Sequence, residues 1–307
     1  MNGSAFNNAY GAQVAFFGNP APTAADGTFI LNGGTNGIGG ASAFFFGSSL
    51  GGTSHWSING NASLDISAID LPGMTLGSIE GDGIIYLGGN NLTVGFDNRT
   101  TNFAGVIQDG GSGSGAGGSL TKTSTGTLAL SGPNTYTGGT SIEAGTLLVQ
   151  TKNASATGTG PVQVNAGTLG GRGKMSGAVT IGSGTGMGAF LAPGVNGVAG
   201  LTTQSSLTFN ADGTYSCEVD KSKTKADKVT AKGVTINSGA LFSFVALDNQ
   251  TLAPGTVFTV INNRSQDPIT GTFSNLPDGS TFTVGSNTFQ TNYKGSDGND
   301  LTLTVVP

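Results

Sequence analysis

Charged residues are scarce in this sequence, and that scarcity limits the kinds of protein it can be. Only 9% of the 307 residues are charged, while 55 are glycine. An ordinary helical or α/β enzyme has far more Lys, Glu and Arg and far less glycine. Glycine without a three-residue period excludes collagen. A hydrophobic fraction of 36% also argues against a disordered chain, which has low hydrophobicity and high net charge.

Cysteine, basic patches and long apolar runs are equally scarce. Cys217 is the only cysteine, so no intrachain disulfide can form, and its alternating surroundings predict a buried small side chain. The net charge of −5 comes with no basic patch of the size that nucleic acids require, so we expect no nucleic-acid partner. No segment is long and apolar enough to cross a membrane, and we expect no membrane insertion of this chain.

The densest cationic run lies between residues 221 and 232, where five lysines are interrupted by Asp227. Such runs are usually solvated loops, which is our interpretation, and specific binding of a polyanion is the alternative. The first 17 residues have neither the basic segment nor the apolar core of a secretion signal. Either secretion does not use an N-terminal signal, or a signal has been removed from the mature chain, which is the interpretation that we favour.

A short motif recurs in the middle of the chain. Gly-Thr-Leu occurs at residues 126–128, 145–147 and 167–169, which is a spacing of 19 to 22 residues. This is the length of one coil of a β-solenoid, in which short strands are joined by tight corners. Stacked coils would place the leucines in one interior ladder, formed by Leu128, Leu147 and Leu169. The corners, where a Cβ atom would clash or a positive φ is needed, would hold Gly126, Gly145, Gly167 and Asn134.

Short alternating runs bounded by turn residues continue along most of the chain, and no amphipathic helix interrupts them. The sequence therefore predicts an all-β fold, mostly a parallel β-solenoid, with a β-rich C-terminal region. We divide it into three zones. Residues 1–76 form a Phe- and Gly-rich N-terminal β region, residues 77–200 form the solenoid with the repeats, and residues 201–307 continue or cap the solenoid.

The segment LTKTSTGTLALSGPNTYTGGTSIEAGTLLV, residues 120–149, resembles the autotransporter-associated β-strand repeat of bacterial autotransporter passengers. The resemblance extends over residues 77–307 with decreasing strength and reaches residues 1–76 only loosely. It implies a right-handed parallel β-helix on the bacterial cell surface or outside the cell. The motif itself carries no catalytic site.

Catalytic chemistry has few candidates. His55 is the only histidine, and a packing role is better supported than that of a general base. Two carboxylate pairs, Glu218 with Asp220 and Asp297 with Asp300, lack the aromatic and cationic neighbours of a sugar cleft. We therefore predict no enzyme, with a polysaccharide-degrading β-helix enzyme as the minor alternative. A single calcium-type motif near residue 297 is too short for a tandem site, so we predict no metal and no cofactor.

The N-terminal zone offers uncharged aromatic segments that could pair with other chains. The candidate assembly residues are Phe16, Phe17, Phe44, Phe45 and Phe46. Packing of these rings inside the first coils is an equally good interpretation. We predict a non-catalytic, secreted or cell-surface structural protein that assembles with itself into filaments or matrix, or contacts other surface and matrix components. A monomeric passenger-like adhesin for glycans or host surfaces is the alternative.

Overall fold

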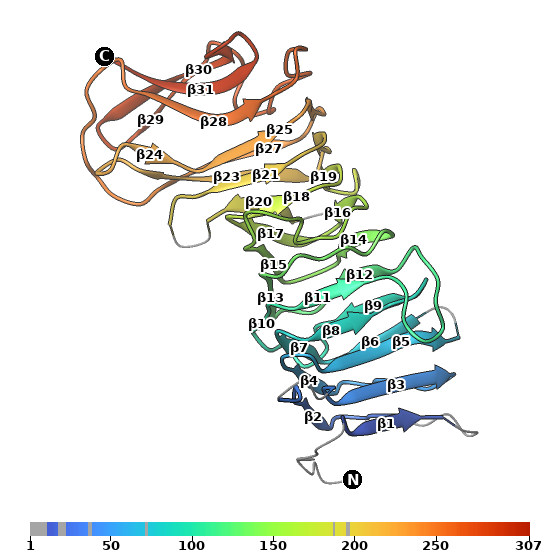
Figure 1. Ribbon diagram of the computed structural model, residues 1–307. Coiled ribbons are helices and arrows are strands. Elements are labelled where there is room, and N and C mark those ends of the chain that lie inside the picture. Colours follow the sequence, from blue (N-terminus) through green and yellow to red (C-terminus); the bar gives the residue numbers. More distant parts are fainter. Residues whose placement is uncertain (1–10, 18–22, 36–38, 71–72, 187, 195–196) are drawn as a thin grey trace. The chain divides into compact units, whose positions relative to one another are not determined.

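The computed structural model describes residues 11–17, 23–35, 39–70, 73–186, 188–194 and 197–307. All regular elements in these ranges are β-strands, and none of the ranges contains a helix (Figure 1). The described residues accordingly include no helix that could cross a membrane. The chain forms two compact units, Met1–Pro161 and Val162–Pro307.

The described residues of unit 1 contribute strands to three parallel sheets. The first contains β1 (Gln13–Phe16), β3 (Ser42–Gly47), β5 (Ser63–Ile69), β8 (Ile84–Tyr86) and β11 (Val106–Gln108). The second contains β2 (Thr28–Leu31), β4 (His55–Ile58), β7 (Ser78–Gly81), β10 (Thr101–Phe103), β13 (Thr127–Leu130) and β15 (Thr146–Val149). The third contains β6 (Gly73–Leu76), β9 (Asn91–Val94), β12 (Ser119–Lys122) and β14 (Gly139–Ile142).

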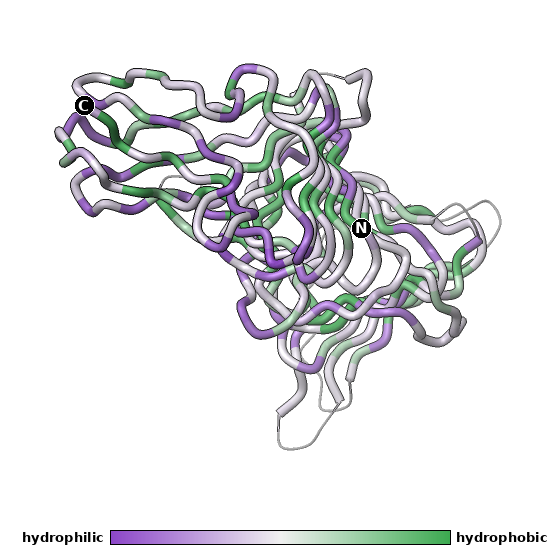
Figure 2. The backbone as a smooth tube through the Cα atoms, turned by 90° about the horizontal axis from the view of Figure 1, so that it is seen from above, coloured by the Kyte–Doolittle hydropathy of each residue, from purple (hydrophilic) through white to green (hydrophobic). Residues whose placement is uncertain are grey.

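Consecutive strands of one sheet in unit 1 come from consecutive coils of the chain (Figure 1). Their registers keep equivalent residues together, as in the pairing of β13 with β15. Along β13 the buried residues alternate with half-buried ones. Because strand side chains point alternately to the two faces of a sheet, this alternation sends the apolar residues of every coil into one interior. Apolar positions therefore recur at corresponding places along the backbone (Figure 2).

The described residues of unit 2 also contribute strands to three sheets. One contains β17 (Gly167–Gly171), β20 (Ala189–Pro193), β23 (Gly213–Asp220) and β27 (Leu241–Ala246) in parallel, with the short β24 (Lys225–Ala226) antiparallel to β23. A second contains β16 (Val162–Val164), β19 (Val179–Ile181), β22 (Leu207–Phe209) and β26 (Val234–Ile236). The third contains β18 (Lys174–Met175), β21 (Gly200–Thr203), β25 (Lys228–Ala231), β28 (Val257–Asn263), β31 (Asp300–Val306), β30 (Asn287–Gly295) and β29 (Thr281–Val284).

The third sheet of unit 2 changes from parallel to antiparallel strand pairing at β28. The pairs from β18 to β28 are parallel, whereas β28 with β31, β31 with β30, and β30 with β29 are antiparallel. Antiparallel strands need only short turns between them, whereas parallel strands need a full crossover. The chain passes once more along β26 and β27 after β28, and its last three strands, β29, β30 and β31, then form an antiparallel meander.

The expected all-β, mostly parallel solenoid is thus confirmed, and so is the β-rich C-terminal region. Phe16 and Phe45, which are 29 residues apart in the sequence, lie beside each other in the register of β1 and β3. The three sequence zones do not coincide with the two compact units and remain a prediction.

Cys217 lies fully buried on β23, and burial raises the pKa of its thiol well above the usual range. Its sulfur lies 3.6 Å from the carbonyl oxygen of Asp227. A protonated, buried thiol is a poor nucleophile, because the thiolate is the reactive form.

Stability should depend on pH through Asp227, which is also fully buried. Burial raises the pKa of this carboxyl to about 7. An unfolded aspartate titrates near pH 4, so between about pH 4 and 7 the unfolded state loses a proton that the folded state retains. The free energy of unfolding therefore falls as pH rises through this window. We expect a thermal midpoint about 2–4 °C lower at neutral pH than near pH 4.5.

The measurement is a series of thermal melts across this pH range for the native chain and for Asp227→Asn. The amide cannot ionise, so the variant should lack the step that the native chain shows between pH 4 and 7. Parallel curves for the two proteins would contradict the assignment of this step to Asp227.

Candidate functional site

The three leucines of the repeated motif all lie in the interior. Leu128 on β13 pairs with Leu147 on β15 in unit 1, and both are buried. Leu169 lies on β17 in unit 2, where it is buried and pairs with Leu191 on β20. The threonine before each leucine is half-buried on the opposite face of its strand. The motif therefore repeats because each coil must supply one apolar side chain to the interior.

The glycines of the motif occupy corners for two different reasons. Gly145 and Gly167 have φ values of +71° and +82°, in the region that favours glycine. Gly126 is not among the described residues with positive φ, but a Cβ atom there would lie 2.2 Å from the carbonyl oxygen of Arg99. The corner at Gly126 is therefore closed by the backbone of a neighbouring coil.

Asn134 does not have the left-handed conformation that its corner position suggested, because it is not among the described residues with positive φ. Its side chain is instead buried and connects neighbouring coils. The Oδ1 atom accepts a hydrogen bond from the N–H of Ile107 at 2.8 Å, and Nδ2 donates to the carbonyl oxygen of Ala156 at 2.5 Å. One amide thus satisfies a donor in one coil and an acceptor in another, a role that the sequence pattern did not indicate.

Two more buried polar groups belong to the same repeat. Tyr136 is fully buried, and its hydroxyl lies 2.6 Å from Oγ1 of Thr140. Lys122 is 1% exposed, and its ammonium donates to the carbonyl oxygens of Thr123 and Ser124 at 2.5 and 3.0 Å. Burial lowers the pKa of Lys122 to about 8, while the charge of Asp97 acts in the opposite direction. The Lys122 ammonium thus satisfies two backbone carbonyl groups at a corner, whereas the Tyr136 hydroxyl is satisfied by another side chain.

The N-terminal edge of unit 1, which we define as β1 and β2, has backbone groups without a strand partner among the described residues. Within the described ranges, β1 pairs only with β3 and β2 only with β4. Each edge strand thus presents one row of backbone N–H and C=O groups that has no strand partner among the described residues. Such an edge can template pairing with another strand. Neither strand contains a charged residue or a proline, which are common means of blocking an edge.

Stacked aromatic rings lie directly beneath this edge. Phe16 of β1 stacks on Phe45 of β3 with ring centroids 4.3 Å apart. Phe29 of β2 stacks on Trp56 of β4, also at 4.3 Å. Phe45 and Trp56 are fully buried, whereas Phe16 and Phe29 are only half-buried. The rings of Phe16 and Phe29 therefore pack on other rings on one face, while their opposite face is only partly covered by described residues.

The five candidate assembly phenylalanines do not share one environment. Phe45 is interior, and Phe16 belongs to the half-buried layer above it. Phe17 is 71% exposed. Phe44 and Phe46 are half-buried on the opposite face of β3 from Phe45, and their ring centroids lie 6.1 Å apart. Interior packing and an outward surface thus both occur, on alternate residues of the same runs.

The last coil of unit 2 is covered in a different way. β27 pairs with β23 along one side, and residues 273–276 lie along its other side. The side chain of Asn275 accepts from the N–H of Phe242 at 2.9 Å and donates to its carbonyl oxygen at 2.8 Å. The N–H of Ser274 donates to the carbonyl oxygen of Ala240 at 2.8 Å. These bonds satisfy groups on an edge that would otherwise be open, so this segment caps the coil.

The repeat geometry agrees with a known family. The family model described as passenger-associated-transport-repeat matches residues 120–149. The chain contains a passenger-type repeat. This finding confirms the resemblance to autotransporter passengers. The passenger-type repeat comprises β12, β13, β14 and β15 with the corner that holds Asn134 and Tyr136.

Two curated relatives support the same assignment. The chain is 31% identical over 164 residues to an extracellular serine protease of Serratia marcescens. The matched stretch covers 52% of this chain and 14% of the relative. It is 37% identical over 98 residues to the adhesin BmaC autotransporter of Brucella suis biovar 1 (strain 1330), covering 32% of this chain and 3% of the relative. The chain thus spans only a small part of either protein.

His55 proves to be a hydrogen-bonding residue and not only a packing one. Its ring lies on β4, with Nδ1 2.7 Å from Oγ of Ser78 and Nε2 3.2 Å from Oε1 of Glu80. The Ser78 hydroxyl donates to Asp97 at 2.5 Å. A hydroxyl whose proton is directed to a carboxylate, and which belongs to a residue only 4% exposed, is not arranged as a nucleophile for the histidine to activate. This cluster connects successive coils of unit 1.

The two carboxylate pairs do not form paired acids. Glu218 accepts from the N–H of Gly197 at 2.7 Å, whereas Asp220 forms an ion pair with Lys223 at 2.7 Å. Asp300 is buried and accepts from a backbone N–H, whereas Asp297 is exposed in the turn before β31. The described residues contain no group of three His, Cys, Asp or Glu side chains that could hold a metal ion.

Proposed function

We propose that this chain is part of a non-catalytic bacterial protein of the cell surface or extracellular space, and that its solenoid pairs with a second copy through the N-terminal edge. The passenger-type repeat supports the location, as do relatives described as an extracellular protease and as an autotransporter adhesin. The scaffold role rests on the way polar side chains are used. His55, Asn134 and Lys122 all hydrogen-bond neighbouring coils.

The observation that carries the pairing is the difference between the N-terminal edge of unit 1 and the last coil of unit 2. The N-terminal edge leaves backbone groups and half-buried aromatic rings without a described cover, while Asn275 caps the last coil of unit 2. A second copy suits the N-terminal edge because the edge is uncharged and meets its own copy without charge repulsion. Exposed Phe17 and Ile30 add apolar area to such a contact.

A contact made by one edge alone produces a pair of molecules, with the same surface used on both copies. Filaments or matrix, the extended form of this proposal, need a second contact elsewhere on the chain. The adhesin alternative is favoured by a different observation, which is the similarity to the Brucella suis adhesin. An adhesin could remain monomeric and still present a ligand surface.

The experiment is sedimentation equilibrium of the purified chain at concentrations up to about 100 µM. We expect an average mass approaching twice 30.3 kDa for the native chain. Ile30→Lys places a charge on the edge, where Ile30 is 53% exposed, and should weaken pairing at least about tenfold. Phe96→Lys is the matched control, because Phe96 is 43% exposed in the same unit but lies outside β1 and β2.

Circular dichroism on both variants verifies that each remains folded. A native chain that stays monomeric throughout the concentration range would overturn the pairing proposal and leave the adhesin alternative. Equal weakening by Ile30→Lys and Phe96→Lys would also overturn it, because the effect would then not belong to the edge.

A further inference from the structure

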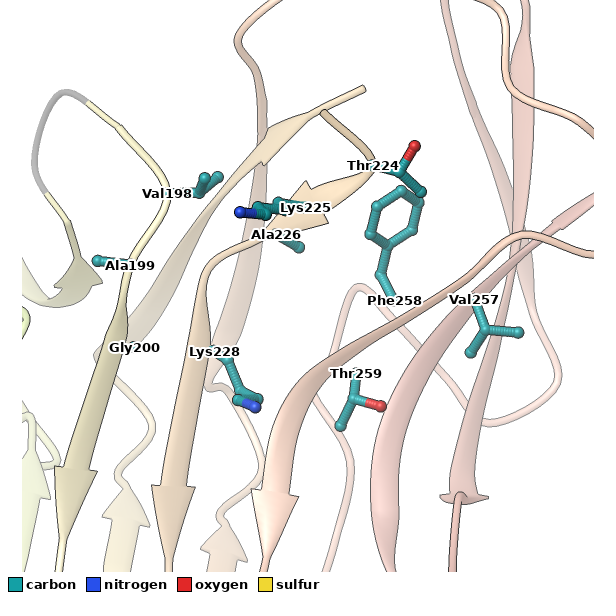
Figure 3. A pocket seen from close by; sticks show the side chains of 10 residues that line it. All are labelled: Val198, Ala199, Gly200, Thr224, Lys225, Ala226, Lys228, Val257, Phe258 and Thr259. Carbon is teal, nitrogen blue, oxygen red and sulfur yellow. The ribbon is translucent and has the colours of Figure 1, made fainter. Parts of the chain in front are cut away.

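Cationic side chains gather around two adjoining pockets of unit 2. Their volumes are about 330 and 420 Å³, and they share Val198 and Lys225. Lys228 lines the first pocket, and Arg172 and Lys223 line the second. We call the two pockets together the cationic groove. Figure 3 shows the first pocket, with Val198 and Lys225 on one side and residues of β28 on the other.

The charge of the groove differs from that of the whole chain. Four of the chain's 12 Lys and Arg residues line it, although the net charge of the chain is −5. Only one carboxylate, Asp220, lines the groove with them. Local clustering of one sign of charge in a concave surface raises the local concentration of counter-ions of the opposite sign. The groove is therefore suited to an anionic ligand.

Most of these cations have no partner within the described part of the protein. Lys223 pairs with Asp220 at 2.7 Å. By contrast, the structure gives the side chains of Arg172, Lys225 and Lys228 no ion pair and no hydrogen bond to any described residue. All three are exposed. Exposed, unpaired cations at a pocket can bind an incoming anion without first breaking an internal ion pair.

Hydrogen bonds fix the wall of the groove that holds Val198 and Ala199. The N–H of Ala199 donates to Asp227 at 2.7 Å, and the N–H of Glu218 donates to the same carboxylate at 2.9 Å. The N–H of Gly197 donates to Glu218 at 2.7 Å. Two carboxylates thus anchor this loop to β23. A wall that is ordered before binding reduces the entropy that a ligand must overcome.

Part of the backbone around the groove has no strand partner among the described residues. The pairing of β25 with β28 begins at Ile261, so the segment of residues 257–259, which lines the groove, pairs with β31 alone within the described ranges. The short β24, which carries Lys225, pairs only with β23 in the same part of the chain. A ligand can therefore meet free backbone groups as well as side chains, namely the cations, the hydroxyls of Thr224 and Thr259, and exposed Val257.

We propose that the cationic groove binds an acidic polysaccharide, with carboxylate or sulfate groups on Arg172, Lys225 and Lys228. Two adjoining pockets suit consecutive sugar residues of one polymer, and each lies within the usual size range of ligand sites. Hydroxyl and apolar side chains match the alternating hydroxyl and C–H surfaces of a sugar ring. The groove lies in unit 2, so this proposal is independent of pairing through the N-terminal edge.

The test is isothermal titration of the full chain with a heparin-derived hexasaccharide, an oligogalacturonate of the same length and neutral maltohexaose. We expect one of the two acidic probes, or both, to bind and maltohexaose not to bind. The double variant Lys225→Gln/Lys228→Gln should bind at least about tenfold more weakly, because two charged contacts are lost. Lys152→Gln/Lys294→Gln removes the same charge at exposed positions outside the groove and should change binding less than about twofold.

The two acidic probes distinguish sulfate from carboxylate as the preferred group. The proposal is overturned if neither acidic probe binds, or if maltohexaose binds equally well. Equal weakening by the groove variant and the control variant would also overturn it, because binding would then follow net charge alone. Thermal melts establish that both double variants are folded before titration.

Discussion

Replacing Asn134 by alanine is expected to lower the free energy of unfolding by about 2–4 kcal/mol. The amide is buried, and its two ends bond the N–H of Ile107 and the carbonyl oxygen of Ala156. Alanine can replace neither bond. Each group left buried without a partner costs about 1–3 kcal/mol. The total loss is smaller than the sum of the two costs, because the coils can relax or admit a water molecule that satisfies part of the lost bonds.

Chemical denaturation at neutral pH measures this loss, and Asn102→Ala is the matched control. Asn102 is exposed on β10, where it accepts a single hydrogen bond from Ser131. We expect that control to change stability by less than about 0.5 kcal/mol. If both variants lost the same small amount, Asn134 would not be a structural connection between coils. The wider consequence is that the passenger-type repeat specifies contacts between coils as well as the shape of a single coil.

The sequence predicts the fold well because the solenoid signal is local. Each coil needs an apolar residue for the interior and a glycine for a corner, so Leu128 and Gly126 reappear as Leu147 and Gly145. The alternation within each run then identifies the face that is buried. These requirements are met inside one coil, and a single chain displays them directly.

Contacts between coils are much harder to predict from sequence. Asn134 contacts residues 27 positions before it and 22 positions after it, and Ser78 lies 23 positions from His55. Such pairs depend on how far each coil is offset from the next, and loop lengths alter that offset. The sequence could therefore assign Asn134 to a corner but could not show that its side chain, and not its φ, has the structural role there.

The cationic groove shows the same limit. The lysine run of residues 221–232 is visible in the sequence as a charge pattern, but its usual interpretation is a solvated loop. Arg172 is 51 residues from Lys223 and 53 from Lys225 in the sequence, and only the stacking of unit 2 brings it to the same pocket. The lysine run becomes a candidate binding site only because the folded chain places some of its side chains around two pockets.

Gly145→Ala should be the second severe substitution, with an expected loss of about 2–4 kcal/mol in the free energy of unfolding. Gly145 has φ +71°, which costs an alanine roughly 1–2 kcal/mol. Its Cβ atom would also lie 2.2 Å from the carbonyl oxygen of Ser124 and 2.8 Å from Nζ of Lys122. The backbone must therefore move, and movement there disturbs the bond from the buried ammonium to Ser124.

Two further glycines separate the causes of this loss when all three variants are compared by chemical denaturation. Gly110 has φ +79°, but a Cβ atom there would have no described atom within 4 Å, so Gly110→Ala should show the backbone cost alone, about 1 kcal/mol. Gly126→Ala meets the carbonyl oxygen of Arg99 at 2.2 Å without a positive φ, so it should show the cost of close approach alone. If the loss at Gly145 were no larger than at Gly110, the contact between coils at this corner would contribute little to stability. A loss near the sum of the other two would mean that the glycine of Gly-Thr-Leu is needed both for its φ and for the close approach of coils.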